Sequence, residues 1–415
     1  MRRNILMAQA LANSDLSVSV LLIAGAHEAS YFRMPTGVDC LTLPALRKEA
    51  NGQYRSRHLD VSVQKLTDVR AKSICAALEA FEPDVFIVDK EPLGANGELE
   101  LTLKRLRNRG YTRFVLGLRD VLDKPISVSR KVRCESCMSK EDDIRNYYDA
   151  VWIYGDPNIY DLASECGFSP DIVEKVDYTG YFDQQQWLES SRHKEFKIPW
   201  DSGTYNSLVA CMVGGGQDGA DVALAFAKAT LPQETCGVVV TGPCMPQEAQ
   251  RKLHHIASFH SGLHIIEFLS EPVLLTSRAD KIISMGGYNT ICEVLSFKKQ
   301  ALIVPRVKPR LEQFVRAERL NNLGLLDILH PNELNPGTLT DWMAQDFKKN
   351  LPVRDRIDLN GLKRLPGMLE ELLDTSHHTA RSKFHQEEVP HVTCQTNAYK
   401  VRVEQLSSSI SSTWS

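Results

Sequence analysis

Apolar runs and amphipathic segments alternate along the first half of the chain. Runs of buried-strand character occupy residues 18–24, 84–89, 114–120 and 150–156. Segments with apolar side chains at helical spacing occupy residues 4–13, 61–81 and 99–109. Strands that alternate with helices imply right-handed crossovers and a parallel sheet. We therefore predict a Rossmann-like, doubly wound domain over residues 1–185.

The alternation stops at a polar stretch and then starts again. Residues 186–205 contain Pro199 and Gly203 and are interpreted as a linker. Five further strands are predicted at residues 208–213, 237–241, 263–268, 281–285 and 301–304. A second Rossmann-like domain is therefore expected over residues 206–373, which makes the chain an α/β protein of two doubly wound parallel-sheet domains. Residues 374–415 are rich in Ser and Thr without a sustained period, and we expect a disordered tail there.

Composition narrows the function classes. The 415 residues carry 49 Lys and Arg against 52 Asp and Glu, a net charge of −3, which gives no electrostatic reason to bind nucleic acid. No apolar run approaches the roughly 18–20 residues of a membrane span, so we expect no transmembrane segment and a cytoplasmic protein, with peripheral attachment to the membrane as the alternative. Cys134 and Cys137 form a Cys-x-x-Cys pair that has no second pair at suitable spacing, and no metal site is assigned.

A glycine-rich turn opens the second domain. Gly214, Gly215 and Gly216 follow a predicted strand and precede a predicted helix. Glycines let backbone N–H groups approach an anion, and the helix N-terminus adds positive dipole. The turn is neither a Walker motif nor a G-x-G-x-x-G motif, and a tight turn without a ligand is the alternative interpretation.

A second glycine turn carries a stronger signal. Gly286 and Gly287 again lie between a predicted strand and a predicted helix. Asn289 and Thr290 are placed to cap that helix or to donate to phosphate oxygens. Glu293 follows inside the helix, where its carboxylate can accept hydrogen bonds from two vicinal hydroxyls, as on a ribose. The alternative is a plain helix cap with a surface glutamate.

A basic loop follows the next predicted strand. Arg306, Lys308 and Arg310 place positive charge beside the expected phosphate site. Glu312 and Gln313, at the start of the next helix, can hold sugar hydroxyls. A solvated basic loop is the alternative for the cations, but three such elements at successive strand ends favour one binding site.

These motifs resemble a known family. Residues 285–320 resemble the donor-binding region of glycosyltransferases with two Rossmann-like domains, the GT-B type, and are similar to glycosyltransferase family 28. A group of predicted glycosyltransferases shares further motifs, which in this chain read Leu116-Gly117-Leu118-Arg119-Asp120, Tyr154-Gly155-Asp156-Pro157 and Tyr178-Thr179-Gly180-Tyr181. The resemblance covers residues 1–373, and it is specific for the fold and the donor.

The resemblance implies roles for the matching positions. The residues implied to contact the donor diphosphate are Gly286, Gly287, Asn289 and Thr290. The residues implied to contact sugars are Glu293 for the ribose, and Glu312 and Gln313 for the transferred sugar. The residues implied to edge the base or to line the cleft are Phe268, Leu269, Gly214, Gly215 and Gly216.

The chain departs from the family at its beginning. Relatives start with a strand and a Gly-x-Gly-His turn before a basic helix start that resembles Arg2-Arg3-Asn4. We therefore expect the first strand, the turn and its histidine to be absent, through truncation or a misassigned start. That histidine is the position the pattern nominates as general base, so the catalytic base is unknown. Asp89, Glu91 and Asp120, at strand ends, are weak candidates that structural roles explain equally well.

The sequence thus predicts a hexosyltransferase. We expect transfer of a hexose-type sugar from a nucleoside-diphosphate sugar, a UDP-sugar by preference, to an unknown acceptor hydroxyl, with a lipid- or glycan-linked acceptor as one option. The expected course is inversion, with no cofactor and no bound metal. A truncated, non-catalytic sugar-nucleotide-binding relative is the first alternative. A sugar-nucleotide epimerase, which shares the two-domain architecture, is the second.

Overall fold

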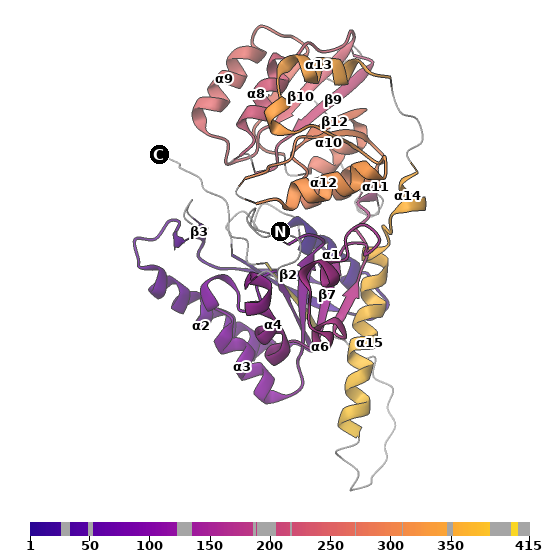
Figure 1. Cartoon of the computed structure of the whole chain (residues 1–415). Coiled ribbons are helices and arrows are strands. Elements are labelled where there is room, and N and C mark those ends of the chain that lie inside the picture. The colour runs from indigo at the N-terminus through magenta and orange to yellow at the C-terminus, as the bar shows by residue number, and fades with distance from the viewer. Residues whose placement is uncertain are drawn as a thin grey trace.

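The computed structural model shows two α/β domains, one above the other in Figure 1. The predicted fold class, two Rossmann-like doubly wound parallel-sheet domains, is confirmed. The structure describes residues 1–25, 34–48, 53–122, 135–185, 188, 205–215, 218–269, 271–308, 310–346, 352–381 and 400–405. For residues 135–139, 375–381 and 400–405 it describes the backbone alone.

The first domain is built on a seven-stranded sheet of order β2-β1-β15-β5-β6-β7-β8, and every pairing in it is parallel. Its strands are β1 (Ser19–Ala24), β2 (Val38–Thr42), β5 (Val85–Asp89), β6 (Arg113–Arg119), β7 (Ala150–Tyr154), β8 (Val176–Tyr178) and β15 (Lys400–Gln405). Every residue of β5 and β7 is buried, as expected of parallel strands that helices cover on both faces. A separate antiparallel pair joins β3 (Leu46–Lys48) to β4 (Tyr54–Ser56).

Helices cover both faces of this sheet. One face packs against α1 (Arg2–Ala12) and α15 (Gly361–Arg381), and the other against α2 (Val63–Phe81), α3 (Glu100–Arg109) and α4 (Glu135–Tyr147). Shorter elements are η2 (Ala95–Gly97), α5 (Leu162–Cys166) and α6 (Pro170–Val173). Local chemistry sets the ends of α2: the Ser62 side chain accepts from the Lys65 N–H at 3.3 Å, and Glu82 adopts a left-handed conformation before Pro83.

The second domain is built on a six-stranded parallel sheet of order β11-β10-β9-β12-β13-β14. Its strands are β9 (Ser207–Met212), β10 (Thr235–Val240), β11 (Leu263–Ile266), β12 (Lys281–Ser284), β13 (Gln300–Ile303) and β14 (Asp327–Ile328). Its helices are α8 (Ala220–Lys228), α9 (Gln247–Ala257), α10 (Pro272–Arg278), α11 (Tyr288–Ser296), α12 (Glu312–Asn322), η3 (Pro331–Glu333) and α13 (Pro336–Ala344). The chain then passes through α14 (Val353–Arg356) into α15, which lies along the first domain rather than the second (Figure 1).

Two described stretches of the segment after residue 373 differ from the disordered tail expected from its composition. Helix α15 continues to Arg381, and residues 400–405 form β15. The composition of the segment did not predict this strand. A strand of a few residues can form without a strong sequence signal when strands on both sides offer unpaired backbone groups, as β1 and β5 do here. Residues 382–399 and 406–415 lie outside the described residues, as does most of the predicted linker.

Strand β15 fills a specific place in the first sheet. It runs parallel between β1 and β5, with Val401 opposite Val85 and Gln405 opposite Asp89. In the order 3-2-1-4 of a doubly wound sheet, this is the position of strand 1. The place of strand 1 in this sheet is therefore occupied by a strand from the C-terminal part of the chain.

Candidate functional site

The predicted donor residues lie along one edge of the second sheet. The turn at Gly286 follows β12, the basic loop at Arg306 follows β13, and the turn at Gly214 follows β9. These three strands are neighbours, since β9 pairs with β12 and β12 pairs with β13. The carboxyl ends of parallel strands are where open α/β sheets bind ligands. The structure therefore brings the three sequence motifs together.

The Gly286–Gly287 turn leaves the start of α11 open to an anion. Gly286 has a φ of +75°, and a Cβ there would lie 2.7 Å from Cγ2 of Ile303, so glycine is required. Gly287 is the N-cap of α11, and no side chain caps this helix. The N–H groups of its first turn, with the half-buried Asn289 and Thr290, are therefore placed to receive phosphate oxygens.

Glu293 is buried rather than a surface residue. It is 1% exposed, in the second turn of α11. Its Oε1 accepts from Nη1 of Arg2 at 2.7 Å, and its Oε2 accepts from the hydroxyl of Thr276 at 2.8 Å. A ribose hydroxyl that bonds to Glu293 would share or replace the contact with Arg2, which comes from the first domain.

The basic loop is tied to its neighbours through Arg306. Its guanidinium donates to Oδ2 of Asp218 at 2.9 Å and forms an ion pair with Glu312, while its backbone N–H donates to Oε1 of Gln313 at 2.9 Å. Burial alone lowers the pKa of Arg306, but the carboxylates of Glu312 and Asp218 outweigh it and raise that pKa. Arg306 thus joins the loop after β13 to the loop after β9 and to the start of α12. Arg310 is half-buried in the same loop.

The first glycine turn has a packing role in the structure. A Cβ on Gly242 would lie 2.2 Å from the carbonyl oxygen of Gly214, so the two loops approach closely. The N–H of Cys244 donates to the carbonyl of Gly215 at 2.9 Å. Gly216 lies outside the described residues. These contacts account for the glycines without a ligand, and their place beside the donor diphosphate stays a prediction.

The predicted base-binding segment lies at the far end of this edge. Phe268 and Leu269 follow β11, the outermost strand on that side. The Phe268 side chain is 47% exposed, whereas Leu269 is partly buried. An exposed aromatic ring at the carboxyl edge is compatible with a base laid against this segment.

The three weak catalytic candidates all have partners. Asp89 is buried and forms an ion pair with Arg3. Glu91 is partly exposed and lies 2.9 Å from Nζ of Lys140. Asp120 is buried and accepts hydrogen bonds from Arg316, from the Tyr181 hydroxyl and from the N–H of Val121. The carboxylate of Asp120 is fully engaged, which favours a structural role for it over proton transfer.

Sequence reasoning missed the residues that join the two domains at this site. Arg316, in α12, is 2% exposed and binds Asp120 across the domain boundary. The rings of Tyr181 and Tyr288 stack with centroids 6.1 Å apart. A signal for Arg316 was present, because it shares the buried face of α12 with Ala317 and Leu320, where a lone charge needs a partner.

Other features of the molecule lie away from this edge. A cavity of about 620 Å³ lies at the starts of β7 and β8 against α15, lined by Trp152, Lys175, Asp177 and Arg364 among others. Cys134 and the side chain of Cys137 are outside the described residues.

Within the described part of the chain, none of the helices combines the length and apolar character needed to cross a membrane.

Comparison with known proteins agrees with this geometry. Residues 210–360 match the glycosyltransferase family 28 C-terminal domain. A UDP-N-acetylglucosamine–N-acetylmuramyl-(pentapeptide) pyrophosphoryl-undecaprenol N-acetylglucosamine transferase of Clostridium botulinum is 32% identical over 117 residues, 27% of this chain. That match spans 32% of the length of the transferase.

Solved structures share the fold. A UDP-GlcNAc 2-epimerase from Neisseria meningitidis, bound to UDP-GlcNAc, has a TM-score of 0.55 at 16% identity, over 89% of this chain and 95% of the epimerase. The UDP-bound MnaA of S. aureus has a TM-score of 0.53 at 12% identity, over 86% of this chain and 96% of that one. At these identities the likeness concerns the two-domain architecture. The resemblance of the second domain to glycosyltransferase family 28, predicted from its glycine turn and basic loop, is confirmed over residues 210–360.

Proposed function

We propose that this protein is a glycosyltransferase that moves a hexose-type sugar from a UDP-sugar to an acceptor hydroxyl, with inversion at the transferred carbon. The family match covers the donor-side domain, which supports the donor class. A lipid-linked acceptor is in keeping with the Clostridium transferase, whose name includes a pyrophosphoryl-undecaprenol group.

The open start of α11 carries the proposal. Its first-turn N–H groups and positive dipole would stabilise the charge that develops on the departing diphosphate. The half-buried Arg310 and the exposed Lys308 would add positive charge to that of Arg306. With these groups the leaving diphosphate needs no divalent ion, and chelation of metals should leave the rate unchanged.

Glu293 would orient the nucleoside. Its buried carboxylate would accept hydrogen bonds from the ribose hydroxyls, with Thr276 holding the second oxygen in place. Glu312 and Gln313, at the start of α12, would contact the transferred sugar, and the segment at Phe268 would edge the base. Deprotonation of the acceptor falls to a group that the first domain presents. Glu91 is the partly exposed candidate, whereas Asp89 and Asp120 are buried and paired with Arg3 and Arg316.

Calorimetric titration with UDP tests the donor site. The Glu293→Ala variant loses charge-assisted hydrogen bonds worth roughly 1.5–3 kcal/mol, so its affinity for UDP should fall by about 10- to 100-fold. Glu293→Gln, which preserves shape and can still accept from Thr276, should lose less. The control is Glu248→Ala, since Glu248 is an exposed glutamate of α9 paired with Lys252. UDP binding by Glu293→Ala equal to that of the control would contradict the assignment.

Gln313→Ala separates sugar contacts from nucleoside contacts. It should weaken UDP-N-acetylglucosamine while sparing UDP, because the contact is to the transferred sugar. Gln313 also accepts from the N–H of Arg306 at 2.9 Å. A loss of affinity for UDP itself, which lacks the transferred sugar, would therefore show that Gln313 acts by holding the basic loop.

Turnover of labelled UDP-N-acetylglucosamine distinguishes the function classes. A transferase moves the label to a product only when a total membrane extract is added as the source of acceptor. An epimerase converts the sugar while it remains linked to UDP, and a binding protein does neither. Either of these last two outcomes would overturn the proposed transfer while leaving the donor site in place.

A further inference from the structure

A buried ion pair joins the two domains directly behind the donor turn. Asp120, which follows β6 in the first domain, is 1% exposed, and Arg316 of α12 in the second domain is 2% exposed. Nε of Arg316 lies 2.7 Å from Oδ2 of Asp120, and Nη2 lies 2.6 Å from Oδ1. This two-point contact fixes the orientation of the guanidinium as well as its distance.

The remaining nitrogen of this guanidinium reaches the donor turn itself. Nη1 of Arg316 donates to the carbonyl oxygen of Gly286 at 3.2 Å. Gly286 holds the positive φ that starts the turn, and the next residues supply the open N–H groups of α11. A carboxylate of the first domain thus reaches the backbone of the donor site through one side chain.

Two tyrosines form a second layer around the pair. The Tyr181 hydroxyl donates to Oδ2 of Asp120 at 2.9 Å, and its ring stacks on Tyr288, the first residue of α11. Burial and the nearby Asp120 raise the pKa of Tyr181 well above its usual value, so the hydroxyl stays a donor at neutral pH. Both routes from the first domain end at the beginning of α11.

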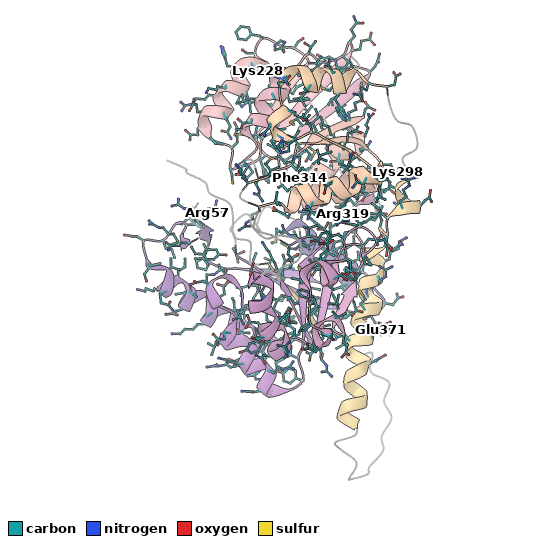
Figure 2. All side chains as sticks on the ribbon, in the orientation of Figure 1. Arg57, Lys228, Lys298, Phe314, Arg319 and Glu371 are labelled. Carbon is teal, nitrogen blue, oxygen red and sulfur yellow. The ribbon has the colours of Figure 1, made fainter. Side chains whose placement is uncertain are left out.

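A neighbouring ion pair shows what a plain contact between the domains looks like. Arg319 lies one turn further along α12, at the boundary of the two domains (Figure 2). It contacts Glu165 at 2.9 Å and the ring of Tyr160, both in the first domain, and its side chain is 41% exposed. Arg316 differs from Arg319 because it is buried and because it also holds the Gly286 carbonyl.

We propose that Asp120 and Arg316 are a positioning pair for donor binding, in which Asp120 acts through Arg316 to hold the Gly286–Gly287 turn in its anion-binding conformation. The contact between the domains would thereby set the affinity for the donor diphosphate. The identity of that ligand rests on the proposed function, whereas the control of the turn does not.

Amide hydrogen exchange tests the control of the turn without any ligand. In Asp120→Asn, the two hydrogen-bonded amides that flank the turn, Gly286 and Ile291, should exchange about tenfold faster, because Arg316 loses its two-point partner. In Arg319→Ala the same amides should exchange as in the unmodified protein. The double variant Asp120→Asn/Arg316→Met leaves no unpaired buried charge, so it keeps the test valid if a single variant folds poorly. Unchanged exchange in Asp120→Asn, or equal acceleration in Arg319→Ala, would overturn the proposal.

Titration with UDP tests the consequence for binding. Asp120→Asn should weaken UDP by about tenfold although it lies in the other domain, and Arg319→Ala should stay within twofold of the unmodified protein. When Arg316 is already Met, adding Asp120→Asn should cause no further loss, because the two residues act as one unit. Additive losses would show that Asp120 does not act through Arg316.

The two experiments separate this proposal from the proposed function. An unmodified protein that binds no UDP overturns the donor assignment, and the exchange result then decides the role of the pair on its own. An unmodified protein that binds UDP, with a variant Asp120→Asn that binds it equally well, overturns the pair and leaves the donor site standing.

Discussion

Among the residues that the structure describes, the three buried arginines are each paired with a carboxylate. Arg70 of α2 is 1% exposed and meets Glu98 through two nitrogens, with Nη2 at 2.8 Å from Oε1, while its Nη1 donates to the Pro44 carbonyl at 2.6 Å. Arg3 with Asp89 and Arg316 with Asp120 repeat the arrangement. Removing one partner strands the other as a buried, uncompensated charge, which costs far more than the pair contributes.

Glu98→Ala should therefore lower the free energy of unfolding by about 3–5 kcal/mol, as measured by urea denaturation. The matched control is Glu79→Ala, because Glu79 meets the exposed Arg105 at 3.2 Å and exposed pairs contribute little. The double variant Arg70→Met/Glu98→Leu should recover most of the loss, since no charge remains buried. A small effect of Glu98→Ala would mean that water reaches Arg70.

Cysteine reactivity should report the same burial at the domain boundary. Burial raises the pKa of the Cys292 thiol to about 12, so the reactive thiolate is scarce at pH 8. Cys40 is partly exposed. Iodoacetamide should therefore label Cys40 well before Cys292, as followed by peptide mass analysis. Equal labelling rates in the folded protein would show that the boundary around α11 opens readily.

Strand β15, which the sequence did not predict, lies in the middle of the first sheet, and we expect the stability of that sheet to depend on it. It pairs on both sides, with β1 and with β5, so its loss leaves two unpaired edges inside the sheet. A chain that ends at residue 374 should have a Tm more than about 5 °C below that of the full chain. In a domain of this size, a loss of about 1 kcal/mol in the free energy of unfolding lowers the Tm by 2–4 °C. A chain that ends at Gln405 is the control and should keep its Tm.

Val403→Pro offers a point test of the same strand. Proline removes a ladder N–H and is not tolerated in the middle of a sheet, and Val403 lies opposite Ile87 of β5. The variant should behave like the chain that ends at residue 374. A Tm equal to that of the unmodified chain would show that β15 contributes nothing to the stability of the sheet.

The sequence predicts elements whose signal is local. Strands such as β5 and β7 read as continuous apolar runs because parallel strands are buried on both faces, and α11 was anticipated from the glycines that precede it. Strand β14 has two residues and β15 is defined by its neighbours, so neither has a signal of its own. The donor motifs could be predicted because their signal is local. The Arg316–Asp120 pair could not be predicted from a local signal, since its members are 196 residues apart in the sequence.

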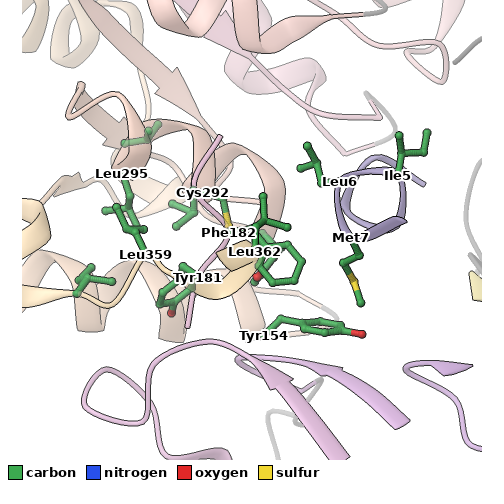
Figure 3. Close-up of a cluster of buried hydrophobic side chains, with 14 of the residues drawn as sticks. Ile5, Leu6, Met7, Tyr154, Tyr181, Phe182, Cys292, Leu295, Leu359 and Leu362 are labelled. Atoms are coloured by element: carbon green, nitrogen blue, oxygen red, sulfur yellow. The ribbon is translucent and has the colours of Figure 1, made fainter. Parts of the chain in front are cut away.

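The two domains share one core at the level of the whole molecule. Figure 3 shows Tyr181 and Phe182 of the first domain beside Cys292 and Leu295 of α11, with α1 close by. The Arg2–Glu293 contact and the Arg316–Asp120 pair join the domains at the same place. Because the donor edge lies against this shared core, a ligand bound there should stabilise both domains against unfolding.

UDP should accordingly stabilise the molecule as one unit. At a free concentration 100 times its Kd, a ligand that binds only the folded state adds about 2.7 kcal/mol to the free energy of unfolding. In scanning calorimetry we expect a single transition that moves to higher temperature with UDP, because unfolding of either domain removes groups that form the site. In Asp120→Asn/Arg316→Met the shift should shrink, since the first domain no longer holds the donor turn. Two transitions, of which only one moves with UDP, would show that the second domain binds the nucleotide alone and that the shared core does not couple them.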